Sequence, residues 1–130
     1  MIGLDTNIVV RLFIDDHQSE AAQRFIAERC TPQTPGFVNV ISLCEAAWVL
    51  QSVYRFDRQS VIDVIADLVA SDDIVVEEIA LVKTALAAYR TGRVSFADLL
   101  IGEVNRARGC RATATFDRSA ARLPTFIPVQ

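Results

Sequence analysis

A chain of 130 residues has room for one compact domain and little room for a second one. Hydrophobic residues make up 52% of the chain and charged residues 22%, which excludes a disordered protein, and no apolar run reaches the roughly 18 residues of a membrane span. The net charge of −3 shows no overall basic excess and the first residues lack a secretory pattern, so we expect one domain, residues 1–130, in the cytoplasm.

The first half of the chain alternates short apolar runs with patterns of helical spacing. Two prolines and a glycine within residues 32–36 predict a loop between a helix and the next strand. The elements predicted in this half are a strand over 2–4, helices over 8–13 and 20–30, a strand over 37–40, and helices over 42–54 and 58–70.

The second half repeats this alternation. Its predicted elements are strands over 74–76, 112–116 and 125–129, and helices over 78–89 and 96–108. Pro128 restricts the last strand to the edge of a sheet, because proline cannot donate a hydrogen bond to a neighbour. Strands that alternate with helices over the whole length predict an α/β fold, a layered sandwich with a mainly parallel central sheet.

Cysteine and histidine usage excludes several kinds of site. The three cysteines, Cys30, Cys44 and Cys110, are odd in number and form no C-x-x-C or Cys/His cluster, which argues against a disulfide framework and a zinc site. Cys44 lies in an apolar stretch and is expected to be a small buried thiol. His17 is the only histidine, and it leaves no Ser-His-Asp or Cys-His set for nucleophilic catalysis.

The basic residues concentrate near the end of the chain. Residues 93–130 hold six arginines against three acids, a net charge of +3, so the rest of the chain must carry −6 to give the total of −3. These arginines are Arg93, Arg106, Arg108, Arg111, Arg118 and Arg122. They are either phosphate contacts for a nucleic acid or a solvated helix face, and Arg93, Arg111 and Arg118 are the candidate RNA-binding residues.

Four of the sixteen acidic residues stand in apolar surroundings. Asp5 and Asp117 each close an apolar strand. Glu45 lies in the first turn of the helix predicted after the strand at 37–40, and Asp98 opens the helix at 96–108. Because ligands of an open α/β sheet bind outside the carboxyl ends of its strands, topology predicts Asp5, Glu45 and Asp117 at one edge.

Helix capping is the alternative for each acid taken singly. Ser42-Leu43-Cys44-Glu45 and Ser95-Phe96-Ala97-Asp98 both match the capping box, and Asp5 and Asp117 also fit turn or cap positions. Four carboxylates at one edge would repel one another, by about 4 kcal/mol for a pair about 4 Å apart at an effective dielectric near 20. Capping does not offset that repulsion, whereas a divalent cation such as Mg²⁺ does.

A metal held by carboxylates can position and deprotonate a water molecule and can stabilise the charge that builds on a phosphodiester. Short polar residues stand beside the acids and suit hydrogen bonds that orient metal ligands. These residues are Thr6, Asn7, Ser95 and Thr115.

The chain resembles the PIN domain family, and within it the VapC-like toxin ribonucleases of bacterial toxin–antitoxin pairs. Four fragments in order carry the resemblance: Ile2-Gly3-Leu4-Asp5-Thr6-Asn7, Ser42-Leu43-Cys44-Glu45, Phe96-Ala97-Asp98-Leu99-Leu100-Ile101 and Thr115-Phe116-Asp117. The likeness covers essentially the whole chain. One departure is Ser95, where many relatives carry an acid three residues before the third core acid.

The resemblance implies a three-layer α/β/α sandwich with a parallel sheet, in which the four core acids bind Mg²⁺ or Mn²⁺. It implies endonucleolytic cleavage of single-stranded or looped RNA. The implied partners are a second copy of the chain, as a homodimer, and a small antitoxin whose tail blocks the active site.

Two other functions compete with this one. A phosphohydrolase of the haloacid dehalogenase type also begins with an apolar strand that ends in aspartate, but it needs a second aspartate two residues later, where this chain has Asn7. A catalytically inactive binding module of the same fold is the second alternative. Loss of a core acid would favour it, and all four are present.

Overall fold

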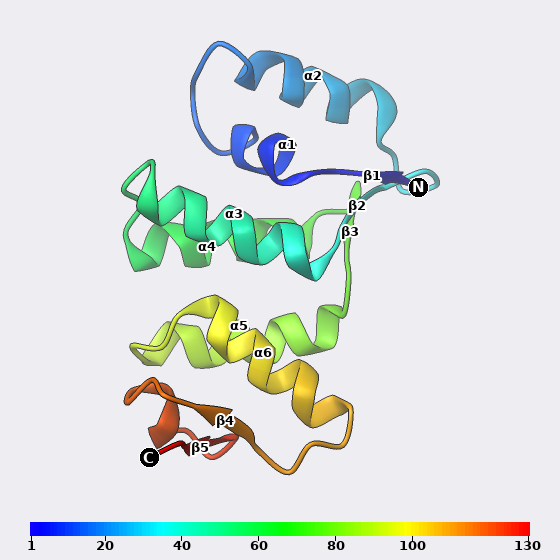
Figure 1. Cartoon of the computed structure of the whole chain (residues 1–130). Coiled ribbons are helices and arrows are strands. Elements are labelled where there is room, and N and C mark those ends of the chain that lie inside the picture. Colours follow the sequence, from blue (N-terminus) through cyan, green and yellow to red (C-terminus); the bar gives the residue numbers. More distant parts are fainter. The chain divides into compact units, whose positions relative to one another are not determined.

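The computed structural model describes all residues, 1–130, which form six α-helices, five strands and one 3-10 helix (Figure 1). The chain divides into two compact units, Met1–Ile79 and Ala80–Gln130. Each unit has its own parallel strands and is considered in turn.

The first unit is built on a sheet of three parallel strands in the order β1-β2-β3. Its strands are β1 (Ile2–Gly3), β2 (Gly36–Val38) and β3 (Ile74–Val76). A Cβ atom added at Gly36 would lie 2.8 Å from Leu4 Cδ1, so a larger residue here would force the Leu4 side chain to shift. The start of β2 is therefore packed closely against the residue that precedes Asp5.

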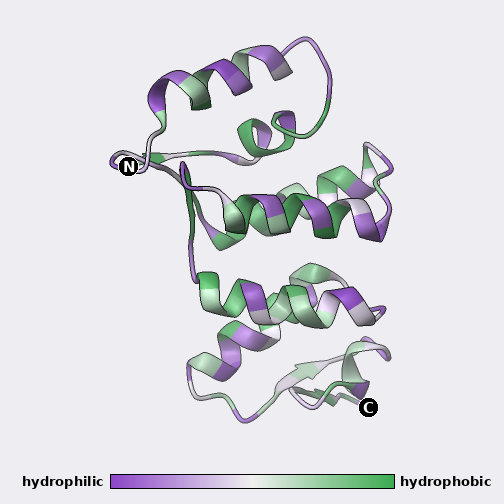
Figure 2. Cartoon of the chain, turned by 180° about the vertical axis from the view of Figure 1, so that it is seen from behind, coloured by the Kyte–Doolittle hydropathy of each residue, from purple (hydrophilic) through white to green (hydrophobic).

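Four helices connect and cover these strands: α1 (Thr6–Arg11), α2 (Ser19–Arg29), α3 (Val40–Ser52) and α4 (Arg58–Ala70). Three of them begin at a side chain that caps the helix, Asp5 for α1, Asn39 for α3 and Asp57 for α4. The hydrogen bond from Ser60 N lowers the pKa of Asp57. Figure 2 shows α2 as largely hydrophilic and α3 as rich in hydrophobic residues, and α1 packs on α3.

The second unit pairs two helices with a sheet of two parallel strands. Its elements are α5 (Ile79–Thr91, which starts at the boundary), α6 (Phe96–Ala107), β4 (Thr113–Thr115), the 3-10 helix η1 (Ala120–Arg122) and β5 (Phe126–Pro128). The rings of Tyr89 and Phe96 meet edge to face with centroids 5.8 Å apart, which fixes the turn between α5 and α6. A Cβ atom at Gly102 would lie 2.7 Å from the Phe126 ring, so α6 approaches β5 closely at this glycine.

The structure confirms the α/β class and the parallel strands, which are present as one parallel sheet in each unit. The bounds predicted for α4 and β3 are also confirmed. The strand predicted over 37–40 ends instead at Val38, because Asn39 caps α3 and the helix begins at Val40. No helix has both the length and the apolar character that crossing a membrane requires.

Candidate functional site

Asp5, Thr6 and Glu45 form a connected group in the first unit. Asp5 follows β1 by two residues and caps α1, where its Oδ1 accepts a hydrogen bond from Ile8 N at 3.2 Å. Thr6 Oγ1 donates to Glu45 Oε1 at 2.8 Å, and this bond joins the start of α1 to α3 across 39 positions of the chain. The structure therefore ties Glu45 to Thr6, the residue next to Asp5 in the chain and one of the predicted orienting residues.

The capping interpretation of Glu45 is wrong. The capping box requires a serine at the N-cap, but Ser42 lies inside α3 and is buried, and the helix is capped by Asn39, whose Oδ1 accepts from Ser42 N at 2.8 Å. Glu45 stands five residues after Val40, in the second turn of α3 and not in the first. Its carboxylate is thus directed by Thr6 and not by the helix end.

Sequence reasoning missed one acid at the same edge of the sheet. Glu77 follows β3 directly, and its Oε1 accepts a hydrogen bond from Val40 N, the first amide of α3, at 2.9 Å. The sequence contains a signal for Glu77, because an acid close after an apolar strand is the pattern that singled out Asp5. Glu77 fixes the beginning of the helix that carries Glu45.

Asp98 lies in the first turn of α6 in the second unit and is half-buried. Ser95 caps this helix, since its Oγ accepts from Asp98 N at 3.1 Å. The Asp98 carboxylate itself accepts no hydrogen bond in the structure. Only half of the capping box is therefore present, and the carboxylate of Asp98 does not contribute to the cap.

Asp117 follows β4 by two residues and leads into η1. Thr115 Oγ1 accepts from Asp117 N at 3.0 Å, and Asp117 Oδ1 accepts from Ala120 N at 2.8 Å. β4 pairs with β5 and does not join the sheet of the first unit. The argument from one shared sheet edge therefore applies to Asp5 and Glu45, and it does not extend to Asp117.

The oxygens that remain free suit a hard cation. Asp5, Glu45 and Asp117 each use one carboxylate oxygen in a hydrogen bond and keep the second oxygen unbonded, and Asp98 keeps both. Carboxylate oxygens are the ligands that Mg²⁺ and Mn²⁺ prefer. Neither unit by itself brings three or more His, Cys, Asp or Glu side chains into a group that could hold a metal ion. The donor chemistry of the four acids fits such an ion, with two of the acids in each unit.

The chain was compared with known proteins. It matches the PIN domain family over residues 2–125, which include all four acids and parts of both units. The chain belongs to the PIN domain family. Membership indicates a nuclease. A search of curated proteins found no match.

Among solved structures, the PIN domain is similar to VapC20 of Mycobacterium tuberculosis, described as a toxin that cleaves the sarcin-ricin loop. The two chains share 21% sequence identity with a TM-score of 0.47, and the likeness covers 95% of this chain and 96% of VapC20.

The charge of the PIN domain is divided between its units. Met1–Ile79 holds 13 acids against 5 arginines, a net charge of −8, and Ala80–Gln130 holds 8 basic residues against 3 acids, a net charge of +5, which together give −3. The three candidate RNA-binding residues, Arg93, Arg111 and Arg118, are all exposed in the basic unit. Arg106 is instead paired with Glu103 at 2.8 Å.

The remaining predicted residues have structural partners. Asn7 Oδ1 accepts from Arg11 Nη1 at 3.1 Å, so its amide oxygen is directed to Arg11 and not to a candidate acid. Burial raises the pKa of the half-buried Cys44 thiol next to Glu45, which makes the thiolate scarce near neutral pH. The four carboxylates therefore remain the candidate groups for chemistry at this site.

Proposed function

We propose that this PIN domain is a metal-dependent endoribonuclease that cleaves single-stranded or looped RNA and serves as the toxin of a toxin–antitoxin pair. The observation that carries the proposal is the hydrogen bond from Thr6 Oγ1 to Glu45 Oε1 at 2.8 Å, which orients one candidate ligand from α1, the helix that Asp5 caps. Membership of the PIN family supports a nuclease, and the family match across both units supports their acting as one domain, residues 1–130.

In this proposal Asp5, Glu45, Asp98 and Asp117 are the ligands of Mg²⁺ or Mn²⁺. When bound, the ion supplies an activated water molecule and charge stabilisation for the phosphodiester. Thr6 holds Glu45 in one orientation, and Thr115 restrains the backbone at Asp117. Ser95 caps the first turn of α6, the turn that carries Asp98.

The basic unit supplies the contacts to RNA. Arg93, Arg111 and Arg118 are exposed and attract phosphates. The acidic unit, Met1–Ile79, carries a net charge of −8 and does not attract them. The proposal also has the chain act on RNA in the cytoplasm.

Two protein partners complete the proposal, a second copy of the chain and a small antitoxin. An apolar pair on α3 supports association, since Ile41 and Trp48 are seven positions apart on the same side of the helix and are 68% and 66% exposed. Exposed apolar side chains of this size on one helix are typical of an interface. Sedimentation at micromolar concentration is expected to show a dimer, and a monomer alone would contradict that part of the proposal.

The test of the activity is cleavage of a labelled RNA stem-loop by the purified chain. We expect cuts in the loop with Mg²⁺ or Mn²⁺ and none with excess EDTA. Binding of the RNA without cleavage under any metal condition would favour the inactive binding module. Hydrolysis of a small phosphomonoester without RNA cleavage would favour the phosphohydrolase.

A further inference from the structure

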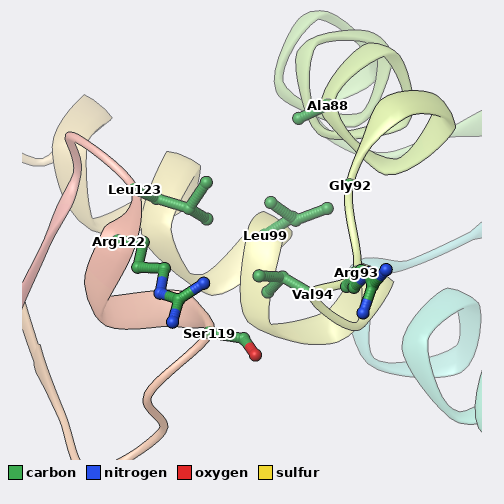
Figure 3. Close-up of a pocket in the computed structure, with 8 residues that line it drawn as sticks. All are labelled: Ala88, Gly92, Arg93, Val94, Leu99, Ser119, Arg122 and Leu123. Atoms are coloured by element: carbon green, nitrogen blue, oxygen red, sulfur yellow. The ribbon is translucent and has the colours of Figure 1, made fainter.

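A hollow of about 200 Å³ lies within the second unit, between α5, the start of α6 and η1 (Figure 3). Val94, Leu99 and Leu123 give it apolar walls, and the side chains of these residues point towards the middle of the hollow in Figure 3. Arg93 and Arg122 also line it, and both are exposed. The hollow therefore combines an apolar interior with two cationic side chains at its border.

The hollow is next to two of the candidate metal ligands. Leu99 directly follows Asp98 in the first turn of α6. Ser119 lines the hollow two residues after Asp117, whose carboxylate holds the start of η1 through Ala120 N at 2.8 Å. Any group bound in the hollow would thus contact the two short segments that carry Asp98 and Asp117.

The chemistry of the lining indicates the ligand. An apolar interior favours a flat, weakly hydrated ring, and neither guanidinium of Arg93 or Arg122 is engaged in an ion pair in the structure. Pockets for drug-sized ligands run from about 300 to 1,000 Å³, so a hollow of about 200 Å³ suits a smaller group. Unpaired RNA bases bind to apolar surfaces and arginine planes, and their flanking phosphates seek cations.

We propose that this hollow holds one unpaired base of the RNA substrate, with Arg93 and Arg122 on the flanking phosphates. The proposal rests on the proposed ribonuclease function and adds a place where a base, and not only the backbone, is bound. The net charge of +5 on this unit attracts RNA more than an acidic protein segment, because each nucleotide of RNA carries a phosphate. The apolar lining gives the base a surface to bind.

The experiment fills the hollow at Ala88, an exposed residue of α5 that lines it. Ala88→Phe is compared with Ala87→Phe, because Ala87 is also exposed on α5 but does not line the hollow. The probes are fluorescein-labelled octauridylate and an abasic ribose-phosphate octamer of equal charge, titrated in EDTA at low salt so that no cleavage occurs. Binding then reports on the hollow independently of the metal.

The unmodified chain is expected to bind octauridylate at least about 5-fold more tightly than the abasic octamer, because the apolar hollow removes part of one base from water. Ala88→Phe should remove that preference, while Ala87→Phe should keep it. Equal binding of the two probes by the unmodified chain would overturn the proposal. So would an Ala88→Phe variant that retains the preference.

The arginines have their own test. Arg122→Ala should weaken both probes and reduce the slope of log affinity against log salt by about 0.7, the contribution of one phosphate of a single strand. Arg90 is an exposed residue of α5 that does not line the hollow, so Arg90→Ala should change the slope less. An Arg122→Ala slope equal to that of the unmodified chain would overturn the placement of phosphates.

Two further outcomes distinguish the base site from a protein-binding site and from the proposed ribonuclease function. If Ala88→Phe leaves RNA binding intact but abolishes binding of an acidic, leucine-containing peptide, the hollow takes a protein segment and the proposal is wrong. If base preference depends on Ala88 but no metal condition gives cleavage, the base site stands and the proposed ribonuclease function falls.

Discussion

The two units of this PIN domain hold their candidate metal ligands in different ways. In Met1–Ile79 the acids are tied by a long-range bond, because Thr6 on α1 donates to Glu45 on α3. In Ala80–Gln130 they are set by local bonds, Ser95 within three residues of Asp98 and Thr115 within two of Asp117. The first unit also carries −8 and the second +5.

The two units therefore differ in what they contribute to the proposed function. The acidic unit has three strands and two acids coupled through the packing of α1 on α3, so its ligands depend on tertiary structure. The basic unit positions its acids with short hydrogen-bonded turns and adds the arginines and the apolar hollow. We infer that both units supply metal ligands, while the second unit also supplies most of the RNA binding.

The largest effect is expected from loss of one acid in either unit. Asp5→Asn and Asp98→Asn should each lower the rate of metal-dependent RNA cleavage on the order of 1,000-fold, since metal stabilisation of the transition state contributes several kcal/mol. Circular dichroism should show both variants folded. Full cleavage by both variants at saturating Mg²⁺ would contradict the claim that each unit supplies metal ligands, because neither Asp5 nor Asp98 would then be one.

The bond between α1 and α3 gives the next effect. Thr6→Val removes the donor to Glu45 but keeps the shape of the side chain, and it should lower metal affinity or cleavage about 10–100-fold. Thr6→Ser keeps the hydroxyl and is the matched control, with activity near that of the unmodified chain. Equal activity of the valine and serine variants would show that Glu45 needs no orienting bond.

The charge difference between the units predicts a smaller change in RNA binding. Replacing Arg93, Arg111 and Arg118 together with alanine should flatten the salt slope by about 2, or about 0.7 for each phosphate contact. The control replaces Arg24, Arg29 and Arg55 of the acidic unit, with the same loss of charge. Equal slopes in the two triple variants would assign the basic unit's arginines to a solvated face.

The smallest effect concerns the cap of α6. Ser95→Ala should lower the free energy of unfolding by about 1 kcal/mol, because the Asp98 amide loses its acceptor. Asp98→Asn should cost less in EDTA, since its carboxylate takes no part in the cap. Mg²⁺ should raise the melting temperature of the unmodified chain and raise that of Asp98→Asn much less. A larger loss in EDTA for Asp98→Asn than for Ser95→Ala would make Asp98 the cap.

Local signals in the sequence predicted much of the fold. The helix predicted over 58–70 has the observed bounds of α4, because its helical periodicity starts directly after Asp57, which caps the helix in the structure. The strand predicted over 37–40 overran its end, because Val40 and Ile41 are β-branched residues that also suit a strand. The start of α3 is fixed partly by Glu77, 37 positions away, and no local pattern contains that bond.

The candidate site shows the same limit. Asp5 and Asp117 could be read from the sequence because each follows an apolar strand, and Ser95 could be read as a cap because the box is local. The partner of Thr6 could not, because Glu45 lies 39 positions away and meets it only through helix packing. Arg122 was not among the candidate RNA contacts, since only the fold places it beside Leu99 in one hollow.

The central claim is that Asp5 and Asp98 are both ligands of the metal that RNA cleavage requires. Isothermal titration with Mn²⁺ tests it directly on the unmodified chain, on Asp5→Asn and on Asp98→Asn. We predict that each variant loses binding at the native affinity, because each change removes a carboxylate ligand. A variant that still binds Mn²⁺ with the native affinity would contradict the account, since the residue changed in it would then not be a ligand.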